Sequence, residues 1–312
     1  NDGWDLLKKE NFKCFEIVSF DEQNLQKELG DVDGILLRTS KLNSNILSKC
    51  RRLKIISRHG VGYDNVDIDY LNKNQIALAI TSTSNAVSVA EYVLTCFLNL
   101  AKNINLSDQL TREGKFNEKA TLPNFFELYK KNVLIFGFGR IGKEVAKRCI
   151  GFEANIFVFD PFIKNKVIEE HGCNPISKIE GIKLADYISI HLPLTTETKN
   201  FISKKEFELM KESVILVNSA RGGIVSENDL FDALIKNKIR GAGLDVFEQE
   251  PPDENHKLFK LPNILLSPHN AALTLECRKR MAVEGAENII KYLKNKDDLN
   301  LNNVVNKKEI GI

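Results

Sequence analysis

The chain has 312 residues, and its 44 basic and 42 acidic side chains leave a formal net charge of only +2. This length is enough to bury two cores of ordinary domain size, and the balanced charge argues against a polybasic surface for nucleic acid or a membrane. Because the sequence shows neither a signal peptide nor an apolar run of about 20 residues, we expect a cytoplasmic protein with two domains.

Strand-like apolar runs alternate with helical segments along most of the chain, a pattern typical of parallel sheets covered on both faces. The runs fall into two series, which predict two sheets. The first series comprises residues 14–18, 34–37, 54–57 and 76–80, and the second comprises residues 133–136, 156–159, 187–190, 214–217, 243–246 and 264–266.

Two long helices are expected to join these series. Residues 86–101 carry a wide apolar stripe, typical of a buried helix, and residues 274–294 would return the chain to the first domain. We therefore predict an α/β fold of two doubly wound domains. A Rossmann domain of residues 84–272 would be inserted in a flavodoxin-like domain of residues 1–83 and 273–312.

A glycine-rich loop follows the first strand of the second series. In the run from Gly137 to Gly142, the first glycine suits a tight turn, and Gly139 has no Cβ to obstruct a pyrophosphate. Gly142 would allow close packing of helix on strand, and the helix N-terminus favours an anion. Taken alone, this pattern could equally be a glycine-rich turn.

The context of the loop favours a dinucleotide site. A second apolar strand ends in Asp160, where a carboxylate would accept hydrogen bonds from an adenosine ribose diol. A carboxylate would also repel a 2′-phosphate, and Pro161 and Phe162 follow it rather than a basic residue. NAD is therefore favoured over NADP. The alternative is that Asp160 simply forms a turn before Pro161.

Other signals concern the helices and the cysteines. Ser226, followed three residues later by Asp229, predicts a helix N-cap with an acidic first turn. The cysteines form no C-x-x-C pair and no cluster with histidine at metal spacing, which predicts free thiols and no metal site. They are Cys14, Cys50, Cys96, Cys149, Cys173 and Cys277.

Charged side chains follow the carboxyl ends of several predicted strands, where ligands bind in open α/β sheets. We expect them to contribute to one active site. They are Arg38 and Arg58 in the first domain and Arg221, Glu250 and His269 in the second.

Several blocks, in this order, resemble the D-isomer-specific 2-hydroxyacid dehydrogenase family, and most closely its D-3-phosphoglycerate dehydrogenase and hydroxypyruvate reductase branch. Besides the glycine loop they are RHGVGYDNVD at 58–67, SNAVSVAE at 84–91, HLPLTTET at 191–198, VNSARGGI at 217–224, DVFEQEP at 245–251 and SPHNAA at 267–272. The resemblance covers nearly the whole chain and implies an NAD-dependent enzyme that interconverts a small D-2-hydroxy acid and its 2-oxo acid.

The resemblance also implies the site residues and a homodimer, whose arm would be residues 86–101 with an irregular segment at 106–129. The small-molecule acid would be 3-phosphoglycerate or glycerate/hydroxypyruvate. The implied catalytic residues are Arg221, Glu250 and His269. The implied cofactor-binding residues are Gly137, Gly139, Arg140, Ile141, Gly142, Asp160, Ser219, Ala220, Asp245 and Ala271, and the implied substrate-binding residues are Arg38, Arg58, Gly60, Val61, Gly62 and Arg221.

The reaction explains why the three catalytic residue types are needed. Reduction of a 2-oxo acid builds charge on the carbonyl oxygen, so a proton donor and a fixed cation must face it. His269 would donate the proton, and Arg221 would hold the carboxylate and polarise the carbonyl. Glu250 would fix the imidazole tautomer and favour the imidazolium.

The residues leave alternatives open. Spacing alone does not choose between Glu250 and Glu248 as the histidine partner. His269 could be only a hydrogen-bonded loop residue, and Arg221 could simply pair with a neighbouring carboxylate. Arg58 could be a structural partner of a carboxylate as readily as a phosphate ligand, and His191 is interpreted as structural. A non-catalytic NAD-sensing protein, like the corepressors that resemble this family, is the alternative function.

The chain also departs from the family's usual start. It opens Asn1-Asp-Gly-Trp, which is helix-like, where a methionine and an apolar strand are usual. In a flavodoxin-type sheet the first strand lies inside, so its loss would expose ladder groups. Either the natural chain extends upstream or this domain is unusual, and the sequence leaves both open.

Overall fold

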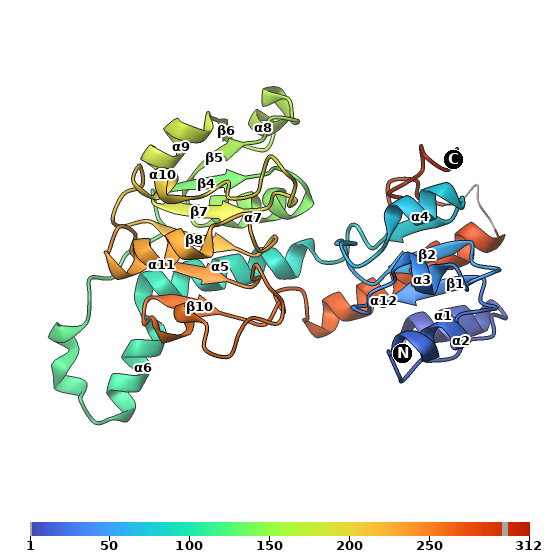
Figure 1. The fold of residues 1–312 in the computed structure, drawn as a ribbon. Coiled ribbons are helices and arrows are strands. Elements are labelled where there is room, and N and C mark those ends of the chain that lie inside the picture. The colour runs from blue at the N-terminus through green and yellow to red at the C-terminus, as the bar shows by residue number, and fades with distance from the viewer. Residues whose placement is uncertain (1, 295–298) are drawn as a thin grey trace. The chain divides into compact units, whose positions relative to one another are not determined.

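The computed structural model describes residues 2–294 and 299–312, and Asn1, at which the upstream question arises, lies outside them (Figure 1). The chain forms two compact units, each with its own sheet. The first unit is Asn1–Asn85 with Leu273–Ile312, and the second unit is Ala86–Ala272. The predicted α/β class with two parallel sheets is confirmed.

The first unit contains a three-stranded parallel sheet in the order β1-β2-β3. Side chains alternate between its two faces because successive residues of a strand point to opposite sides. Ile56 and Leu78 pack toward α2, α3 and α4, whereas Ile55 and Ala77 pack toward α1 and α12. The elements are β1 (Gly34–Leu37), β2 (Ile55–Arg58), β3 (Ala77–Ile80), α1 (Asp2–Lys9), α2 (Glu22–Glu28), α3 (Ser44–Leu47), α4 (Ile68–Lys73) and α12 (Leu275–Lys294).

The prediction of a strand at residues 14–18 is wrong. This segment has no regular secondary structure, and Phe15 and Val18 are 49% and 88% exposed. A strand requires a neighbour for its backbone groups, and within residues 2–294 and 299–312 the sheet pairs β1 with β2 alone. Apolar alternation without a ladder partner therefore leaves extended chain.

The second unit contains a seven-stranded parallel sheet in the order β10-β9-β8-β7-β4-β5-β6. The strand order reverses between β4 and β7, which is the point where doubly wound sheets bind ligands beyond their carboxyl ends. The short β6 was not predicted. The strands are β4 (Asn132–Phe136), β5 (Asn155–Phe159), β6 (Asn174–Pro175), β7 (Tyr187–Ile190), β8 (Ile215–Asn218), β9 (Gly241–Leu244) and β10 (Ile264–Leu266).

Helices cover both faces of this sheet (Figure 1). One face packs against α5 through Val93 and Phe97 and against α7 through Val145. The other face packs against helices that include α9 and α11. The helices are α5 (Ala86–Lys102), α6 (Ile104–Arg112), α7 (Arg140–Gly151), α8 (Asn165–Glu169), α9 (Lys178–Leu184), α10 (Lys204–Phe207) and α11 (Glu227–Ile235), with 3-10 helices η1 (Phe116–Thr121) and η2 (Lys257–Lys260).

Helix predictions hold in most places. The predicted helices at 86–101 and 274–294 correspond to α5 and α12, and the Ser226 side chain caps α11 through the Asp229 N–H as predicted. The segment 106–129 is only partly irregular, because α6 and η1 occupy much of it. Neither of these two elements contains a buried residue.

Three further observations bear on function. Among the described helices, none combines the length and the apolar character needed to cross a bilayer. The described part of the chain holds no group of three or more metal-binding side chains. All six cysteines are free thiols, and five of them are buried.

Candidate active site

The glycine loop lies between β4 and α7 and is built around close backbone contacts. Gly137 has φ +91, a conformation that favours glycine. A Cβ on Gly142 would lie 2.1 Å from the Gly137 carbonyl oxygen, so only glycine fits there. A Cβ on Gly139 would meet no atom within 4 Å, and this residue lies at the N-terminus of the 12-residue α7. The loop is therefore tight toward the protein and open where an anion would approach.

Asp160, at the end of β5, uses both carboxylate oxygens within the protein. Oδ2 accepts the N–H of Phe138, at 2.8 Å, and thereby joins the glycine loop to the end of β5. Oδ1 accepts the N–H of Phe162, at 2.9 Å, which forms the turn at Pro161. The turn-forming role is thus present, and each oxygen keeps a further lone pair for a ribose hydroxyl.

Two orphaned polar atoms lie at neighbouring strand ends beside this loop. Ser219 Oγ and His191 Nδ1 are buried, and neither has a hydrogen-bond partner within the described residues. The preceding residues, Ile190 and Asn218, are paired in the sheet. Because buried polar atoms are nearly always bonded, this place suits the polar groups of a dinucleotide. Together with the open side of Gly139, it shows that the residues present fit NAD.

His191 is held neutral in this setting. Burial lowers its pKa to about 3, and its Nε2 lies 2.6 Å from Ser189 Oγ. Its carbonyl group packs against Gly137, where a Cβ would come within 2.7 Å of the oxygen. His191 therefore has a structural role, because its carbonyl group packs against Gly137 of the glycine loop.

The structure pairs His269 with Glu250 at the carboxyl edge of the same sheet. His269 Nδ1 lies 2.8 Å from Glu250 Oε2, and Glu250 Oε1 accepts the N–H of Phe247 at 3.1 Å. The hydrogen bond to Glu250 raises the pKa of His269 against the effect of burial. Burial raises the pKa of Glu250, but its hydrogen bond with His269 and the charge of that residue reverse this, and the net shift is downward.

Nδ1 is engaged with Glu250, which leaves the other ring nitrogen of His269 for a reacting group. Nε2 makes no hydrogen bond within the described residues, and about half of the side chain is exposed. The pair thus has the geometry of an acid or base whose tautomer is fixed by a carboxylate.

Arg221 lies close enough to this pair for its charge to lower the pKa of both His269 and Glu250. The turn that carries it is fixed by Asn218, whose side-chain amide donates to the Arg221 carbonyl at 2.9 Å and accepts the Ala220 N–H at 3.1 Å. The three predicted catalytic residues therefore share one region of the second unit.

Glu248, the other candidate partner for the histidine, points elsewhere. Its Oε1 accepts the backbone N–H of Glu227, the first residue of α11, at 3.0 Å. Its own N–H donates to Glu227 Oε1 at 2.6 Å. The carboxylate that contacts His269 is that of Glu250.

Asp245 supports the turn that contains His269. It is 1% exposed, and it accepts hydrogen bonds from Ser267 Oγ and from the N–H groups of Asn270 and Ala271. Burial raises its pKa. His269 has φ +52, so the bonds on either side hold a backbone conformation that is uncommon for residues other than glycine.

Tyr92 of α5 extends this network, because its hydroxyl lies 2.7 Å from Ser267 Oγ. Tyr92 was not among the predicted site residues, because nothing in its sequence context within α5 indicated a polar role.

In the first unit, the predicted substrate residues lie at the end of β2 and β1. Within the described residues, the N–H groups of Gly60, Val61 and Gly62 donate no hydrogen bond. The Arg58 guanidinium donates to the carbonyls of Gly62, at 2.6 Å, and of Leu37, at 3.0 Å, and so braces this loop. Arg38 is exposed. The loop thus offers free amides for an anion, and Arg58 has at least a structural role.

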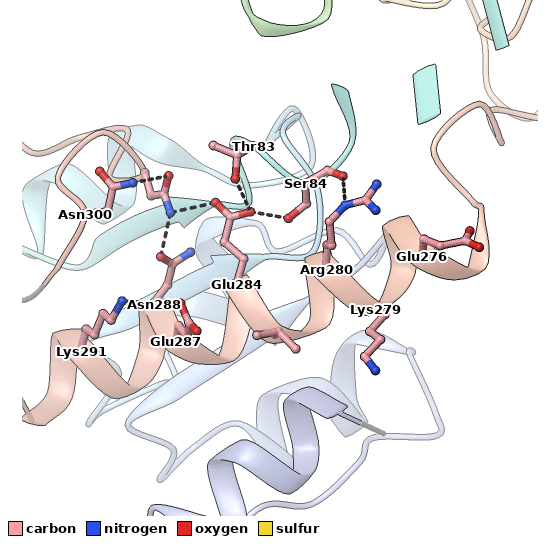
Figure 2. Close-up of a pocket in the computed structure, with 12 residues that line it drawn as sticks. Thr83, Ser84, Glu276, Lys279, Arg280, Glu284, Glu287, Asn288, Lys291 and Asn300 are labelled. Carbon is pink, nitrogen blue, oxygen red and sulfur yellow. Dashed lines mark hydrogen bonds and ion pairs between the residues drawn. The ribbon is translucent and has the colours of Figure 1, made fainter. Parts of the chain in front are cut away.

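A cavity of about 640 Å³ in the first unit contains none of the predicted site residues. Figure 2 shows that Glu284 of α12 points to Thr83 and Ser84, whose hydroxyl groups donate to its carboxylate. The side-chain amide of Asn303 also donates to this carboxylate, at 3.0 Å. Arg280 Nε donates to the Ser84 carbonyl at 3.0 Å. These polar groups satisfy one another and anchor the segment after β3 to α12, so we assign them a structural role.

The chain resembles known proteins in both sequence and structure. Residues 94–271 match the family model described as "D-isomer specific 2-hydroxyacid dehydrogenase, NAD binding domain". The chain is 35% identical to a D-3-phosphoglycerate dehydrogenase of Archaeoglobus fulgidus, over 93% of this chain and 55% of that protein. It is also 35% identical to a hydroxypyruvate reductase of Thermotoga maritima, over 92% of this chain and 93% of that protein.

Among solved structures, a D-lactate dehydrogenase from Aquifex aeolicus, complexed with NAD and lactic acid, aligns with a TM-score of 0.82. Its sequence is 30% identical, and the alignment covers 90% of this chain and 88% of that one. The chain spans about half the length of the phosphoglycerate dehydrogenases that it matches.

Proposed function

The chain belongs to the D-isomer specific 2-hydroxyacid dehydrogenase family, and we propose that it is an NAD-dependent enzyme that interconverts a small D-2-hydroxy acid and its 2-oxo acid. The observation that carries the proposal is the 2.8 Å contact of His269 Nδ1 with Glu250 Oε2, beside Arg221 and in the NAD-binding unit. The names of the relatives are those of enzymes, which supports catalysis rather than cofactor sensing alone.

NAD would supply or take up the hydride. The residues that would hold it follow the strand ends at the switch point of the sheet, where Gly139 is open, Ser219 Oγ is unbonded within the described residues and Asp160 keeps free lone pairs. The proposed cofactor residues are Gly137, Gly139, Arg140, Ile141, Gly142, Asp160, Ser219, Ala220, Asp245 and Ala271.

His269 would carry the proton. In reduction of the 2-oxo acid, the protonated imidazole donates from Nε2 to the carbonyl oxygen as negative charge develops there. Glu250, on Nδ1, stabilises the imidazolium and holds the ring. In oxidation, the neutral ring accepts the hydroxyl proton at the same nitrogen. Arg221 keeps its charge throughout and would hold the substrate carboxylate and polarise the carbonyl.

The substrate proposal rests on the loop after β2 and on Arg38. Unbonded amides at Gly60, Val61 and Gly62 suit a carboxylate, and the exposed Arg38 guanidinium suits a phosphate or another polar end. We therefore expect a phosphorylated or small polar 2-oxo acid, such as phosphohydroxypyruvate, hydroxypyruvate or glyoxylate, to be preferred over a branched apolar one.

Assembly and location are part of the same proposal. We propose a homodimer formed through α6 and η1, whose apolar side chains are exposed in a single chain. The six free thiols suit a reducing compartment, and we propose the cytoplasm.

A turnover assay tests the function. Purified protein with NADH should reduce at least one of glyoxylate, hydroxypyruvate, phosphohydroxypyruvate and pyruvate, and His269→Ala should abolish most of that activity. If NADH binds but no member of the panel is reduced, the NAD-sensing alternative replaces the enzyme. The highest catalytic efficiency with a large apolar 2-oxo acid would overturn the substrate proposal.

A further inference from the structure

A second glutamate and histidine pair lies beside the loop that carries Glu250. Glu227, at the start of α11, is 8% exposed, and its Oε2 lies 3.0 Å from His256 Nε2. His256 is itself packed against the rings of Phe247 and Phe259. An ionisable residue is seldom buried in this way without a specific partner.

The other oxygen of Glu227 is bonded to the loop after β9. Oε1 accepts the N–H of Glu248 at 2.6 Å, and Glu248 in return accepts the N–H of Glu227 at 3.0 Å. These two reciprocal bonds join the start of α11 to the residue that follows Phe247. We refer to Glu227, Glu248 and His256 as the clasp.

A third contact fixes the same loop. A Cβ on Gly222 would lie 1.8 Å from the Phe247 carbonyl oxygen, so the chain just after Arg221 presses directly on this residue. The N–H of Phe247 donates to Glu250. Phe247 is therefore fixed by its contact with Gly222, and Glu248 is fixed by its two bonds with Glu227. Together these contacts determine where the Glu250 carboxylate meets His269.

We propose that Glu227 is a positioning residue for the proposed reaction: held by His256, it fixes the loop from which Glu250 reaches His269. The expected effect on turnover rests on the proposed function. The expected effect on the contact between Glu250 and His269 does not depend on it. The titratable groups bonded to Glu227 within the described residues are the His256 ring and the backbone of Glu248, whose carboxylate in turn accepts the Glu227 N–H, whereas Lys257 is bonded to Asn228. Glu227 touches neither the substrate nor the reacting atoms in this scheme.

The primary test is the titration of His269, followed by NMR in the protein without NAD. Glu227→Ala removes the clasp, so the bond from Glu250 should weaken and the pKa of His269 should fall. Glu227→Gln keeps an acceptor for the Glu248 N–H and should restore most of the wild-type pKa. Asn228→Ala is the matched control, because it removes a bond between α11 and Lys257 but leaves the clasp in place.

A double variant distinguishes positioning from a general loss of order. If Glu227 acts through Glu250, adding Glu227→Ala to Glu250→Gln should cause little further fall in the pKa of His269, since coupled residues are not additive. If Glu227→Ala lowers the pKa of His269 equally in the wild-type and in the Glu250→Gln protein, the inference is overturned. So does an unchanged pKa in a folded Glu227→Ala protein.

Turnover gives an independent reading. Glu227→Ala should lower kcat for 2-oxo acid reduction on the order of tenfold, move its alkaline limb toward acid and leave KM for NADH nearly unchanged. If this variant does not fold, His256→Ala replaces it and should shift the His269 pKa in the same direction by less; no shift overturns the proposal. If wild-type protein lacks turnover but its His269 pKa still depends on Glu227, the proposed function fails and the positioning role stands.

Discussion

His269 combines an uncommon backbone conformation with a hydrogen bond to a carboxylate. Its φ of +52 is held by the bonds of Asp245 to the two following residues, and Nδ1 is bonded to Glu250. Strain of this kind persists where surrounding contacts fix it, and it is frequent at functional sites. The histidine is thus placed in advance of substrate binding, which lowers the entropic cost of reaching a reactive geometry.

The proton-transfer role predicts a specific pH dependence. Glu250 raises the pKa of His269, and reduction requires the protonated ring, so its rate falls as pH rises through that pKa. Glu250→Gln removes the negative charge and should lower the pKa. The alkaline limb of kcat/KM for reduction should move toward acid, with a loss of roughly tenfold or more at pH values above the new pKa. The acidic limb for oxidation should move the same way.

The control is Glu254→Gln, an exposed carboxylate a few residues along the same loop, which should leave both limbs in place. An unshifted profile for Glu250→Gln, together with near-normal turnover of His269→Ala, would contradict the mechanism.

For single residues, the sequence predicted which side chains belong to the site better than it predicted which residues they contact. Strand ends and motif order predicted Arg221, Glu250 and His269, because ligand groups follow the carboxyl ends of parallel strands. The choice between Glu248 and Glu250 depends on which way the loop turns, and that is set by Glu227, 21 residues earlier. Such a contact leaves no mark in local spacing, so neither the clasp nor Tyr92 was predicted.

Among the elements, the junction of β4 and α7 should be the least tolerant of change. Gly142→Ala would place a Cβ 2.1 Å from the Gly137 carbonyl oxygen. Since neither backbone can yield easily, we expect a loss of about 1–3 kcal/mol in unfolding free energy and a roughly tenfold or greater loss of NADH affinity. Thermal unfolding and NADH fluorescence titration measure the two effects.

Gly151→Ala, at the other end of α7, has open space around the new Cβ. It should be neutral or slightly stabilising, because alanine reduces the entropy of the unfolded chain. If Gly142→Ala and Gly151→Ala had the same stability and NADH affinity, close packing at Gly142 would not be required.

Asp160 should set the cofactor preference of the same element. We expect NADH to be used better than NADPH, because the carboxylate accepts from a ribose diol and repels a 2′-phosphate. Asp160→Ala should reduce the preference for NADH over NADPH roughly tenfold or more. It should also weaken both cofactors, since it frees the Phe138 N–H, so the ratio of catalytic efficiencies is the decisive measurement. Comparable efficiencies in the unmutated protein would refute the assignment.

Element prediction succeeded for short runs rich in apolar residues, as at 34–37, 187–190 and 264–266, which match β1, β7 and β10. It failed at 14–18, because a strand is defined by its neighbour and not by its own sequence. β6 is only two residues long and contains Pro175, which is why its composition gave no strand signal.

For the whole molecule, the proposed homodimer is supported by the segment between α5 and β4. Short helices are marginal in water unless packing stabilises them, yet α6 and η1 bury no residue and expose Ile104, Leu106 and Phe116. Figure 1 shows this segment extending away from the rest of the second unit. Covering it with a second copy would remove the exposed apolar surface from water.

We therefore expect light scattering at micromolar concentration to give twice the 35.3 kDa mass of the chain. Leu106→Glu with Phe116→Glu should shift the mass toward the monomer without loss of fold, because both side chains are exposed in the single chain and a buried unpaired charge is costly only in the interface. Ile235→Glu, equally exposed at the end of α11, should leave the dimer intact. A monomeric wild-type protein would contradict the assembly, and a dimer unaffected by the double variant would place the interface elsewhere.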